Sequence, residues 1–287
     1  MTENRADHSV LVGTSGFSFD DWVGPVYPEG MKRTDWLGYY ERELGFPILE
    51  VNYTYYAMPQ AKTLAAMSAK TTDDFQFVVK AHKSMTHELW TDKKRIERID
   101  NAEVFPRFVE ALTPLLDAGK LSAVLAQFPY FFYRNRDNAE YIRDFRERLG
   151  DLPVVIEFRN REWHDEKTME YLADQNLGYC VVDEPRLKGL MPFHPAATTE
   201  LAYFRFHGRN TNWFRAPMEV RYDYLYSTDE LTELLEGIMA VSGDAKKTLA
   251  FFNNCHAGQA AKNALEMVKM LQEKLDQDAG GGDVTPG

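Results

Sequence analysis

Charged side chains follow directly after an apolar, β-branched run of this sequence, where a buried strand would end. Glu157 and Arg159 come immediately after "LPVVI" at residues 152–156, and their spacing of two residues puts them on one face of an extended chain. A carboxylate beside a guanidinium could hold an anionic ligand or relay protons. Such a pair could equally be a structural ion pair, so the interpretation depends on whether other strands end in the same way.

The same pattern recurs along the chain. Polar residues at the ends of other apolar runs are Glu50 and Asn52, Lys80 and His82, Gln127, Asp183, Arg205 and His207, and Asn253 and Asn254. Where two of them are spaced by two residues, they share a face. Charge on one face is easier to accommodate in a solvated site than beneath a helix layer. We therefore expect these side chains to converge on one site.

The elements that would position them alternate regularly. Strands are expected at residues 9–14, 48–53, 75–82, 122–128, 153–159, 178–184, 202–208 and 248–254. Helical patterns occupy residues 34–44, 60–70, 102–116, 138–149, 166–176, 228–241 and 258–275, whereas residues 185–200 are typical of a loop. Alternating strands and helices closed by a final helix predict a single-domain α/β fold, a (β/α)8 TIM barrel; an open doubly wound sheet is the alternative.

Three ranges are expected along the chain. Residues 1–8 form a short N-terminal extension, residues 9–276 form the barrel, and the Gly-rich residues 277–287 form a disordered tail. Two long loops, at residues 15–33 and 83–101, would lie on the carboxyl face of the barrel, where active sites of this fold are built. In the first loop, Phe17, Phe19, Trp22 and Tyr27 are more typical of packing than of a stacking platform.

Composition limits the partners. The chain has 287 residues and a formal net charge of −11, which argues against a broad nucleic-acid or membrane surface, although a local basic pocket keeps nucleic acid open. No apolar run approaches the roughly 20 residues that span a bilayer, and the start lacks a leader-like segment, so a cytoplasmic location is expected. Cys180 and Cys255 lack CxxC spacing and are expected to be reduced thiols.

A metal site is one way to use these residues. Carboxylates and imidazoles at the strand ends could bind a divalent ion, as in sugar isomerases and some nucleases of this fold, through Glu50, His82, Glu157, Asp183 and His207. The cations expected in the same mouth would oppose such an ion, and no HxH, HxxxH or HExxH spacing occurs. We therefore predict no metal and no cofactor.

An anion site is the preferred hypothesis. "HGR" at 207–209 and "NNCHAG" at 253–258 correspond to the loops that commonly hold phosphate in this fold, and Gly208 and Arg209 would provide close backbone approach and charge. Lys80, flanked by Arg159 or Arg205, would have a depressed pKa and act as a base or amine nucleophile. The alternative is that Lys80 only pairs with Glu50 or Glu157.

Blocks spread over nearly the whole chain resemble, in order, those of the YecE-like family, also called domain of unknown function family 72. They are "VGTSGFSFDDWVGPVYP" (12–28), "LEVNYTYYAMP" (49–59), "FQFVVKAHKSMTH" (75–87), "VLAQFPYFF" (124–132), "IEFRNREW" (156–163), "VVDEP" (181–185), "FRFHGR" (204–209) and "FFNNCHAGQAAKNA" (251–264). The resemblance implies a TIM barrel and brings no established reaction. The chain departs from the family pattern at Phe17, Val26, Asn160 and Cys255, which puts a catalytic role for Asn160 or His256 in doubt.

The predicted site combines the strand ends with the resemblance. Its catalytic residues are expected to be Lys80, Glu157, Asp183 and His207. Its ligand-binding residues are expected to be Ser15, Trp22, Glu50, Asn52, Tyr56, His87, Gln127, Arg159, Arg205, Gly208, Arg209 and Asn254. The expected partner is a small anionic molecule, phosphorylated or carboxylated.

Three functional classes stay open at this point, and so does the oligomeric state. They are a metal-independent enzyme, a metal-dependent hydrolase acting on a sugar phosphate or a nucleic-acid lesion, and a non-catalytic ligand-binding protein. A metal assay separates the first two classes, and turnover of the bound ligand separates both from the third.

Overall fold

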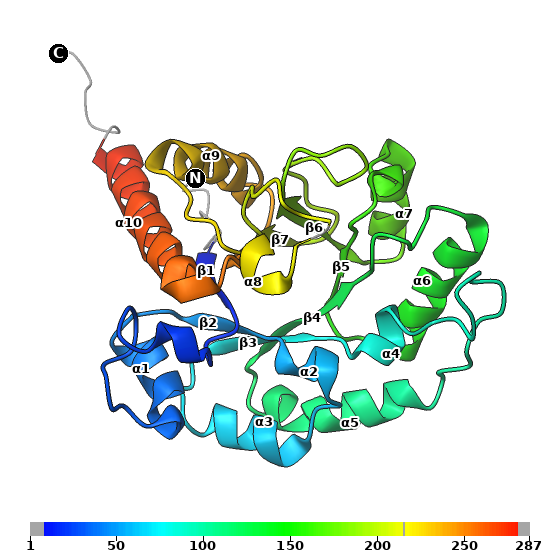
Figure 1. Cartoon of the computed structure of the whole chain (residues 1–287), viewed down its shortest axis with the longest axis horizontal. Helices are drawn as coiled ribbons and strands as arrows, with labels where there is room; N and C mark the ends of the chain where they lie inside the picture. Colours follow the sequence, from blue (N-terminus) through cyan, green and yellow to red (C-terminus); the bar gives the residue numbers. More distant parts are fainter. Residues whose placement is uncertain (1–8, 215, 281–287) are drawn as a thin grey trace, which may run out of the picture.

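Eight parallel strands form a closed barrel in the order β1 to β8 (Figure 1). The structure is a computed structural model that describes residues 9–214 and 216–280, apart from the side chains of residues 218, 219 and 278–280. The strands are β1 Ser9–Ser15, β2 Ile48–Val51, β3 Gln76–Lys80, β4 Leu121–Gln127, β5 Val154–Glu157, β6 Gly178–Asp183, β7 Leu201–Phe206 and β8 Lys247–Phe252. The predicted TIM barrel is therefore confirmed, and the open sheet is excluded.

Helices on the outside of the barrel connect the strands (Figure 1). The expected ones are α1 Trp36–Arg42, α3 Ala61–Ser68, α5 Val104–Asp117, α6 Arg136–Arg148, α7 Glu166–Asp174, α9 Thr228–Ser242 and α10 Gln259–Gly280. Residues 185–200 contain no helix, as predicted. Short helices that the sequence analysis did not predict are α2 Tyr53–Tyr56, α4 Lys83–Thr86 and α8 Met218–Arg221. A single turn is too short to show a helical period, which explains why they were missed.

Local sequence explains where these helices begin and which face they bury. The side chain of Asn135 accepts a hydrogen bond from the backbone nitrogen of Asn138 and caps α6, and Tyr141 and Phe145 of this helix face the core. Ser227 and Glu230 form a capping box at the start of α9. Such caps satisfy amide groups that the first turn leaves unpaired, so they fix the start of each helix.

The barrel closes where β1 pairs with both β2 and β8, and a glycine permits the close approach. Thr14 is in register with Leu49 of β2 and with Phe252 of β8. A Cβ atom on Gly13 would overlap the backbone oxygen of Ile48, so only glycine fits at this point of β1. Side chains of β2, β5 and β6 are buried at every position, as is typical of parallel strands covered on both faces.

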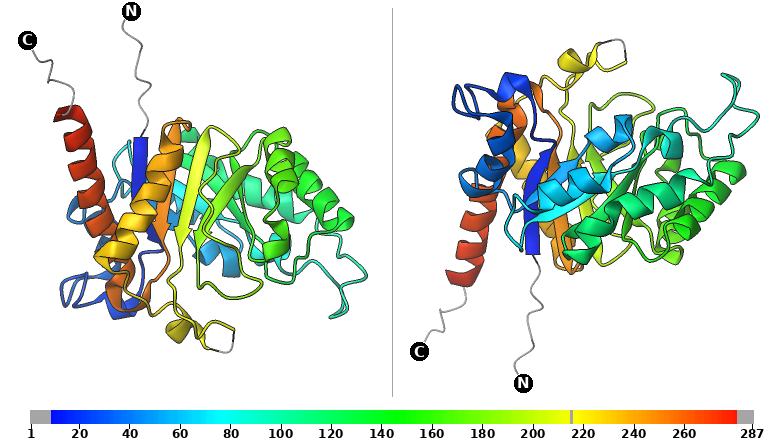
Figure 2. Two further views of the ribbon diagram at one scale, coloured as in Figure 1. Left: turned by 90° about the horizontal axis from the view of Figure 1, so that it is seen from above. Right: turned by 90° about the horizontal axis from the view of Figure 1, so that it is seen from below.

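The loops that follow the strands gather at one end of the barrel. Figure 2 shows α8 and the loop that carries the short 3-10 helix η1, Asp20–Trp22, projecting from the end opposite the start of β1. These are the carboxyl ends of the parallel strands, where ligand sites of this fold form.

The last helix extends into the range that was expected to be a disordered tail. Helix α10 continues to Gly280, so residues 277–280 of the expected tail are helical, while residues 1–8 and 281–287 lie outside the described part. No helix in the described ranges has the length and apolar character needed to cross a membrane.

Candidate functional site

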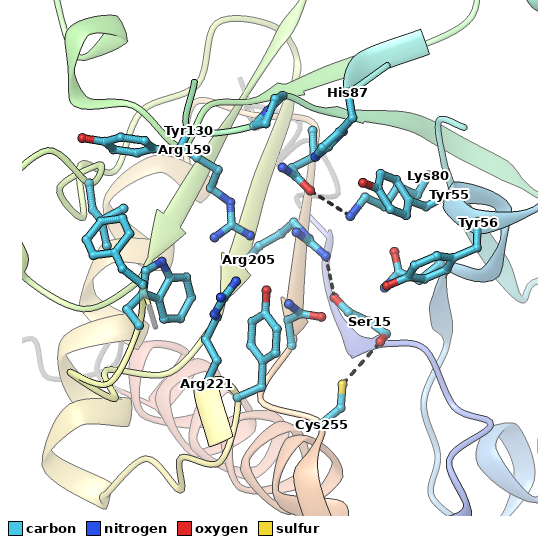
Figure 3. A pocket seen from close by; sticks show the side chains of 18 of the residues that line it. Ser15, Tyr55, Tyr56, Lys80, His87, Tyr130, Arg159, Arg205, Arg221 and Cys255 are labelled. Carbon is cyan, nitrogen blue, oxygen red and sulfur yellow. Dashed lines mark hydrogen bonds between the residues drawn. The ribbon is translucent and has the colours of Figure 1, made fainter. Parts of the chain in front are cut away.

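A cavity of about 610 Å³ opens at the carboxyl end of the barrel (Figure 3). Its lining contains the cationic side chains of Lys80, Arg159, Arg205 and Arg221 and no carboxylate among the residues that the structure describes. The aromatic residues that line it are Phe19, Tyr55, Tyr56, Tyr130, Trp213, Phe214 and Tyr222, and the other lining residues are Ser15, Asn52, His87, Gln127, Pro129, Leu190, Asn253 and Cys255.

The floor of the cavity is a buried ion network centred on Arg205. The Arg205 side chain is 1% exposed. Its Nε and Nη2 atoms donate to the two carboxylate oxygens of Glu50 at 2.9 and 2.7 Å, and its Nη1 donates to Glu157 at 2.5 Å. The Tyr203 hydroxyl donates to Glu50 at 2.6 Å, and Ser15 Oγ accepts from Arg205 at 3.3 Å. Each of the three nitrogen atoms of this guanidinium therefore has an oxygen partner inside the barrel.

Arg159 connects the network to the cavity wall. Its Nε lies 2.5 Å from Glu157 Oε1, and its Nη1 donates to Glu184 at 2.9 Å. Burial alone would raise the pKa of Glu157, but Arg159 and Arg205 hold that pKa well below its ordinary value, so the carboxylate is charged. Burial outweighs the effect of Arg159 at Glu184 and raises the pKa of that carboxyl to about 7.

His207 belongs to this network and does not line the cavity. Asn253 Nδ2 lies 2.8 Å from His207 Nδ1, and because an amide nitrogen can only donate, Nδ1 accepts. The ring proton is then on Nε2, which lies 3.2 Å from Glu157 Oε1. Burial, followed by the charge of Arg159, moves the pKa of His207 well below its ordinary value, so the imidazole is neutral. Its position suits orientation of Glu157 and Asn253.

Lys80 is a cation of the cavity without an acidic partner among the described residues. Its Nζ donates to the amide oxygen of Gln127 at 3.0 Å and lies 4.8 Å from the centre of the Tyr55 ring. Within the described ranges it forms no ion pair, so the expected alternative of pairing with Glu50 or Glu157 is wrong. Burial, and then the charge of Arg205, lowers the pKa of Lys80 from 10.5 to about 7.

Arg221, at the end of α8, is the cation of the cavity that the sequence analysis missed. Its Nη2 donates to the backbone oxygen of Ala216 at 3.3 Å, and its guanidinium lies 5.5 Å from the centre of the Trp213 ring. Its Nε has no hydrogen-bond partner among the described residues. Figure 3 shows the side chain extending toward the same space as Arg205.

The predicted donors after β7 and β8 are not arranged around an open point. Arg209 Nη2 and Nη1 donate at 2.8 Å to Asp183 and Glu233, respectively, and the backbone nitrogen of Gly208 donates to the Tyr226 hydroxyl. In the turn that precedes α10, the backbone nitrogen of Ala257 donates to a carboxylate oxygen of Asp21. These donors already have protein partners, and Gly208, Arg209 and Ala257 lie outside the cavity, whereas Asn253 and Cys255 of the loop after β8 line it.

The predicted site residues fall into two groups, those that line the cavity and those that lie behind its lining. Those that line the cavity are Ser15, Asn52, Tyr56, Lys80, His87, Gln127, Arg159 and Arg205. Those that do not are Trp22, Glu50, Glu157, Asp183, His207, Gly208, Arg209 and Asn254. Trp22 Nε1 donates to the backbone oxygen of Cys255, and Asn254 Nδ2 donates to that of Tyr224. Of the four residues predicted to be catalytic, Lys80 alone reaches the cavity.

Cavity residues that the sequence analysis did not select lie mainly in aperiodic segments. Tyr55 is on α2, Tyr130 follows β4, and Trp213, Phe214, Arg221 and Tyr222 lie between β7 and α9. The density of aromatic and basic residues in "NTNWFR" and "RYDYLY" was the signal that could have indicated them. Cys255 also lines the cavity, and both it and Cys180 are free thiols.

The described carboxylates and imidazoles are not arranged as a metal site. Among the described residues, no group of three or more His, Cys, Asp and Glu side chains is placed to hold a metal ion. The carboxylates of Glu50 and Glu157 are bound to Arg205, and that of Asp183 is bound to Arg209. A divalent ion would have to displace these guanidinium groups.

Comparisons with known proteins agree with this architecture. The family model described as "Protein of unknown function DUF72" matches residues 11–282. UPF0759 protein YunF from Bacillus subtilis is 32% identical over 274 residues, which cover 91% of this chain and 94% of the relative. The crystal structure of a DUF72 family protein from Thermotoga maritima is 47% identical with a TM-score of 0.85, and covers 92% of this chain and 99% of its own.

Two further solved structures extend the comparison. A DUF72 family protein from Enterococcus faecalis is 28% identical with a TM-score of 0.80, over 92% of this chain and 96% of its own. D-psicose 3-epimerase, solved in the presence of D-fructose, is 11% identical with a TM-score of 0.50, over 85% of this chain and 93% of its own. At that identity the likeness concerns the fold alone.

Proposed function

Because this chain belongs to the DUF72 family of proteins of unknown function, which supplies no reaction, we propose its function from the cavity itself. The cavity binds a small anionic ligand, phosphorylated or carboxylated, and Lys80 transfers protons to or from it without a required metal. The observation that carries this proposal is the separation of charge: the carboxylates lie beneath the floor, and the cations reach the surface.

Charge compensation supports an anion more than a cation. Arg205 and Arg159 are paired with three carboxyl groups, those of Glu50, Glu157 and Glu184, so the floor adds no net positive charge. Lys80 and Arg221 both line the cavity. Among the described residues, each of them donates hydrogen bonds to neutral groups and to no carboxylate. A ligand carboxylate or phosphate would provide the missing acceptors through charge-assisted hydrogen bonds. The same two cations would repel a divalent metal.

Lys80 is the cavity group best suited to acid-base chemistry. A pKa of about 7 leaves a substantial fraction of the amine neutral at neutral pH, with a lone pair able to accept a proton. Gln127 holds one N–H of the amine and thereby orients it. A bound anion would stabilise the ammonium form and raise its pKa again, so binding would itself favour proton uptake by Lys80. Glu157 and His207 would act through Arg159 and Asn253 as positioning residues.

Thermal unfolding with added anions tests this proposal. Phosphate, sulfate, citrate and phosphosugars should raise the melting temperature, since a ligand at a hundredfold excess over Kd stabilises the fold by about 2.7 kcal/mol. Arg221→Ala should abolish most of the shift. Arg136→Ala is the matched control, because that arginine is exposed and pairs with Glu140 on α6, away from the cavity.

Metal dependence is tested in the same assay. Protein treated with a chelator and then dialysed should give the same anion-induced shift. The proposal is wrong if none of the anions stabilises the parent protein, or if Arg221→Ala responds as the parent does. A shift that appears only after zinc or manganese is restored would favour the metal-dependent hydrolase instead.

A further inference from the structure

Aromatic side chains form two facing walls of the cavity, with the arginine floor between them. Tyr55 and Tyr56 of α2 stand on one side, their rings 4.9 Å apart and edge to face. Trp213, Phe214 and Tyr222 also line the cavity and belong to the connection between β7 and α9. In Figure 3, Tyr130 lies across the cavity from Tyr55 and Tyr56, and Arg159 and Arg205 lie between them.

Two of these rings are largely exposed to solvent, so they contribute little to the core. Tyr56 is 62% exposed and Phe214 is 54% exposed, and the Phe214 ring packs edge to face on Tyr130 at 5.5 Å. Single exposed apolar residues are ordinary, but several that line one concave surface are typical of a binding site. Covering these rings would remove apolar surface from water, and a flat ligand group would cover them most efficiently.

The size of the cavity argues against a simple inorganic anion. A volume of about 610 Å³ lies within the range of roughly 300–1,000 Å³ that is typical of sites for small organic ligands. An anion held by Lys80 and Arg221 would leave the aromatic walls in contact with water. The ligand that fills the cavity therefore has a second part beside its charged group.

Polar groups in the walls narrow the nature of that second part. A sugar or polyol needs many acceptors for its hydroxyl groups, and the described lining has no carboxylate. The amide oxygen of Gln127 accepts from Lys80, and the amide nitrogen of Asn253 donates to His207. Asn52 keeps a side-chain oxygen without a hydrogen-bond partner among the described residues, so it can accept from a ligand N–H or O–H. Aromatic contact with few polar anchors fits a planar ring better than a polyol.

We propose that the anionic ligand carries an aromatic or heteroaromatic ring, which binds between Tyr56 and Phe214 while its charged group binds Lys80 and Arg221. This inference rests on the proposed function and names the substrate class of the same site. The ring is held by stacking and edge-to-face contacts, and Asn52 accepts a hydrogen bond from a polar substituent on it. Aryl phosphates, aryl carboxylates and nucleotide-like compounds share this chemistry.

Phenyl phosphate and glycerol phosphate both carry a phosphate group, but only phenyl phosphate carries an aromatic ring. Comparing their affinities therefore separates the contribution of the ring from that of the charge. Both should bind the parent protein, and phenyl phosphate should bind about tenfold more tightly, in line with the energy of one aromatic stacking contact. Quenching of Trp213 fluorescence gives the affinity, and Trp213→Phe identifies the signal because the other tryptophans lie outside the cavity lining. Isothermal titration calorimetry repeats the measurement without an optical probe.

Substitutions of the exposed rings give the decisive comparison. Tyr56→Ala and Phe214→Ala should each weaken phenyl phosphate by about fivefold or more and leave glycerol phosphate unchanged. Tyr56→Phe should retain the preference because it keeps the ring. Tyr133→Ala is the matched control, since Tyr133 is 44% exposed and lies outside the cavity.

The outcomes distinguish the two proposals. Equal affinity for both phosphates, unchanged in Tyr56→Ala and Phe214→Ala, would overturn the ring inference and leave anion binding intact. Failure of both phosphates to bind would overturn anion binding and the ring inference together. A preference for phenyl phosphate that survives removal of both rings would place the aromatic group elsewhere and would also overturn the inference.

Discussion

The charges in the cavity floor and the charges on the cavity walls differ in how they are balanced. In the floor, Arg205 is enclosed by Glu50 and Glu157, and each of its nitrogen atoms has an oxygen partner. On the surface, Lys80 and Arg221 interact with an amide, a backbone oxygen and aromatic rings. Balanced charges build the scaffold, and unbalanced charges on a cavity wall mark the place for a ligand.

Two arginines that follow β7 show the same difference at closer range. Arg209 binds Asp183 and Glu233 through its guanidinium nitrogens, so it fastens the β7 loop to β6 and α9. Arg221 has no carboxylate partner within the described residues and lies over Trp213. The sequence analysis selected Arg209 because it is close to the strand end. The geometry favours Arg221 as the ligand-binding residue.

Arg205→Met should give the largest loss of stability. It leaves Glu50 and Glu157 buried without their main partner, and breaking a buried pair in this way costs about 3–5 kcal/mol. Urea denaturation measures the change in the free energy of unfolding. A loss of under about 1 kcal/mol would show that the network is not the support of the floor, because such a value is typical of exposed ion pairs.

Arg209→Ala should have the next largest effect. Removing charged hydrogen bonds to Asp183 and Glu233 should cost about 1.5–3 kcal/mol. The phosphate-induced rise in melting temperature should persist, since this side chain lies outside the cavity lining. If Arg209→Ala keeps its stability but no longer responds to phosphate, the roles of the two arginines are reversed.

Lys80→Met should stabilise the protein. Burial and Arg205 disfavour the ammonium of Lys80, so replacing it with an uncharged chain of similar length should raise the free energy of unfolding at pH 6–7 by about 1–3 kcal/mol. Lys120→Met is the control and should destabilise, because Lys120 Nζ donates to oxygens of Ser68 and Thr71. A variant Lys80→Met that is less stable than the parent at pH 6 would contradict this account.

The gain from Lys80→Met should depend on pH with a definite sign. The folded pKa of Lys80, about 7, lies below its ordinary value of 10.5, so between these values the unfolded chain binds more protons. The free energy of unfolding contributed by Lys80 therefore rises with pH across this window. The advantage of Met should be full below pH 7 and should vanish as pH approaches 10.5. Denaturation series at pH 6, 8 and 10 measure this trend.

Arg221→Ala should have the smallest effect on stability. Since this side chain has no acidic partner among the described residues, its loss should change the free energy of unfolding by less than about 0.5 kcal/mol. Phosphate binding should nevertheless be lost. A variant that unfolds markedly earlier without ligand would indicate that Arg221 is structural, and the contrast with Arg209 would not hold.

The fold could be predicted because each of its parts leaves a local signal. Apolar runs gave the strands, and amphipathic stretches gave the longer helices, so the barrel followed from their order. The charges at strand ends, such as Glu157 and Arg159, were also visible in this way. Both do lie at the carboxyl end of β5, as expected.

The sequence could not show which of the polar residues line the cavity and which pair with one another inside the barrel. Spacing indicates which face a side chain is on, but not which partner it meets across the barrel. Asp183 and Arg209 meet each other, and Glu50 meets Arg205 over a separation of 155 residues. Arg221 and Phe214 lie in a connection without a period, so their place in the cavity depends on the path of that loop.

The location of a bound anion tests the central claim most directly. Selenate is a phosphate-like anion whose anomalous scattering reveals its position in a crystal. The strongest anomalous peak that is not in a lattice contact should lie in the cavity, within about 3 Å of donor atoms of Lys80 and Arg221, the usual length of a charged hydrogen bond. A peak beside Arg209 and Gly208 instead, or an empty cavity at selenate concentrations that raise the melting temperature, would contradict the account.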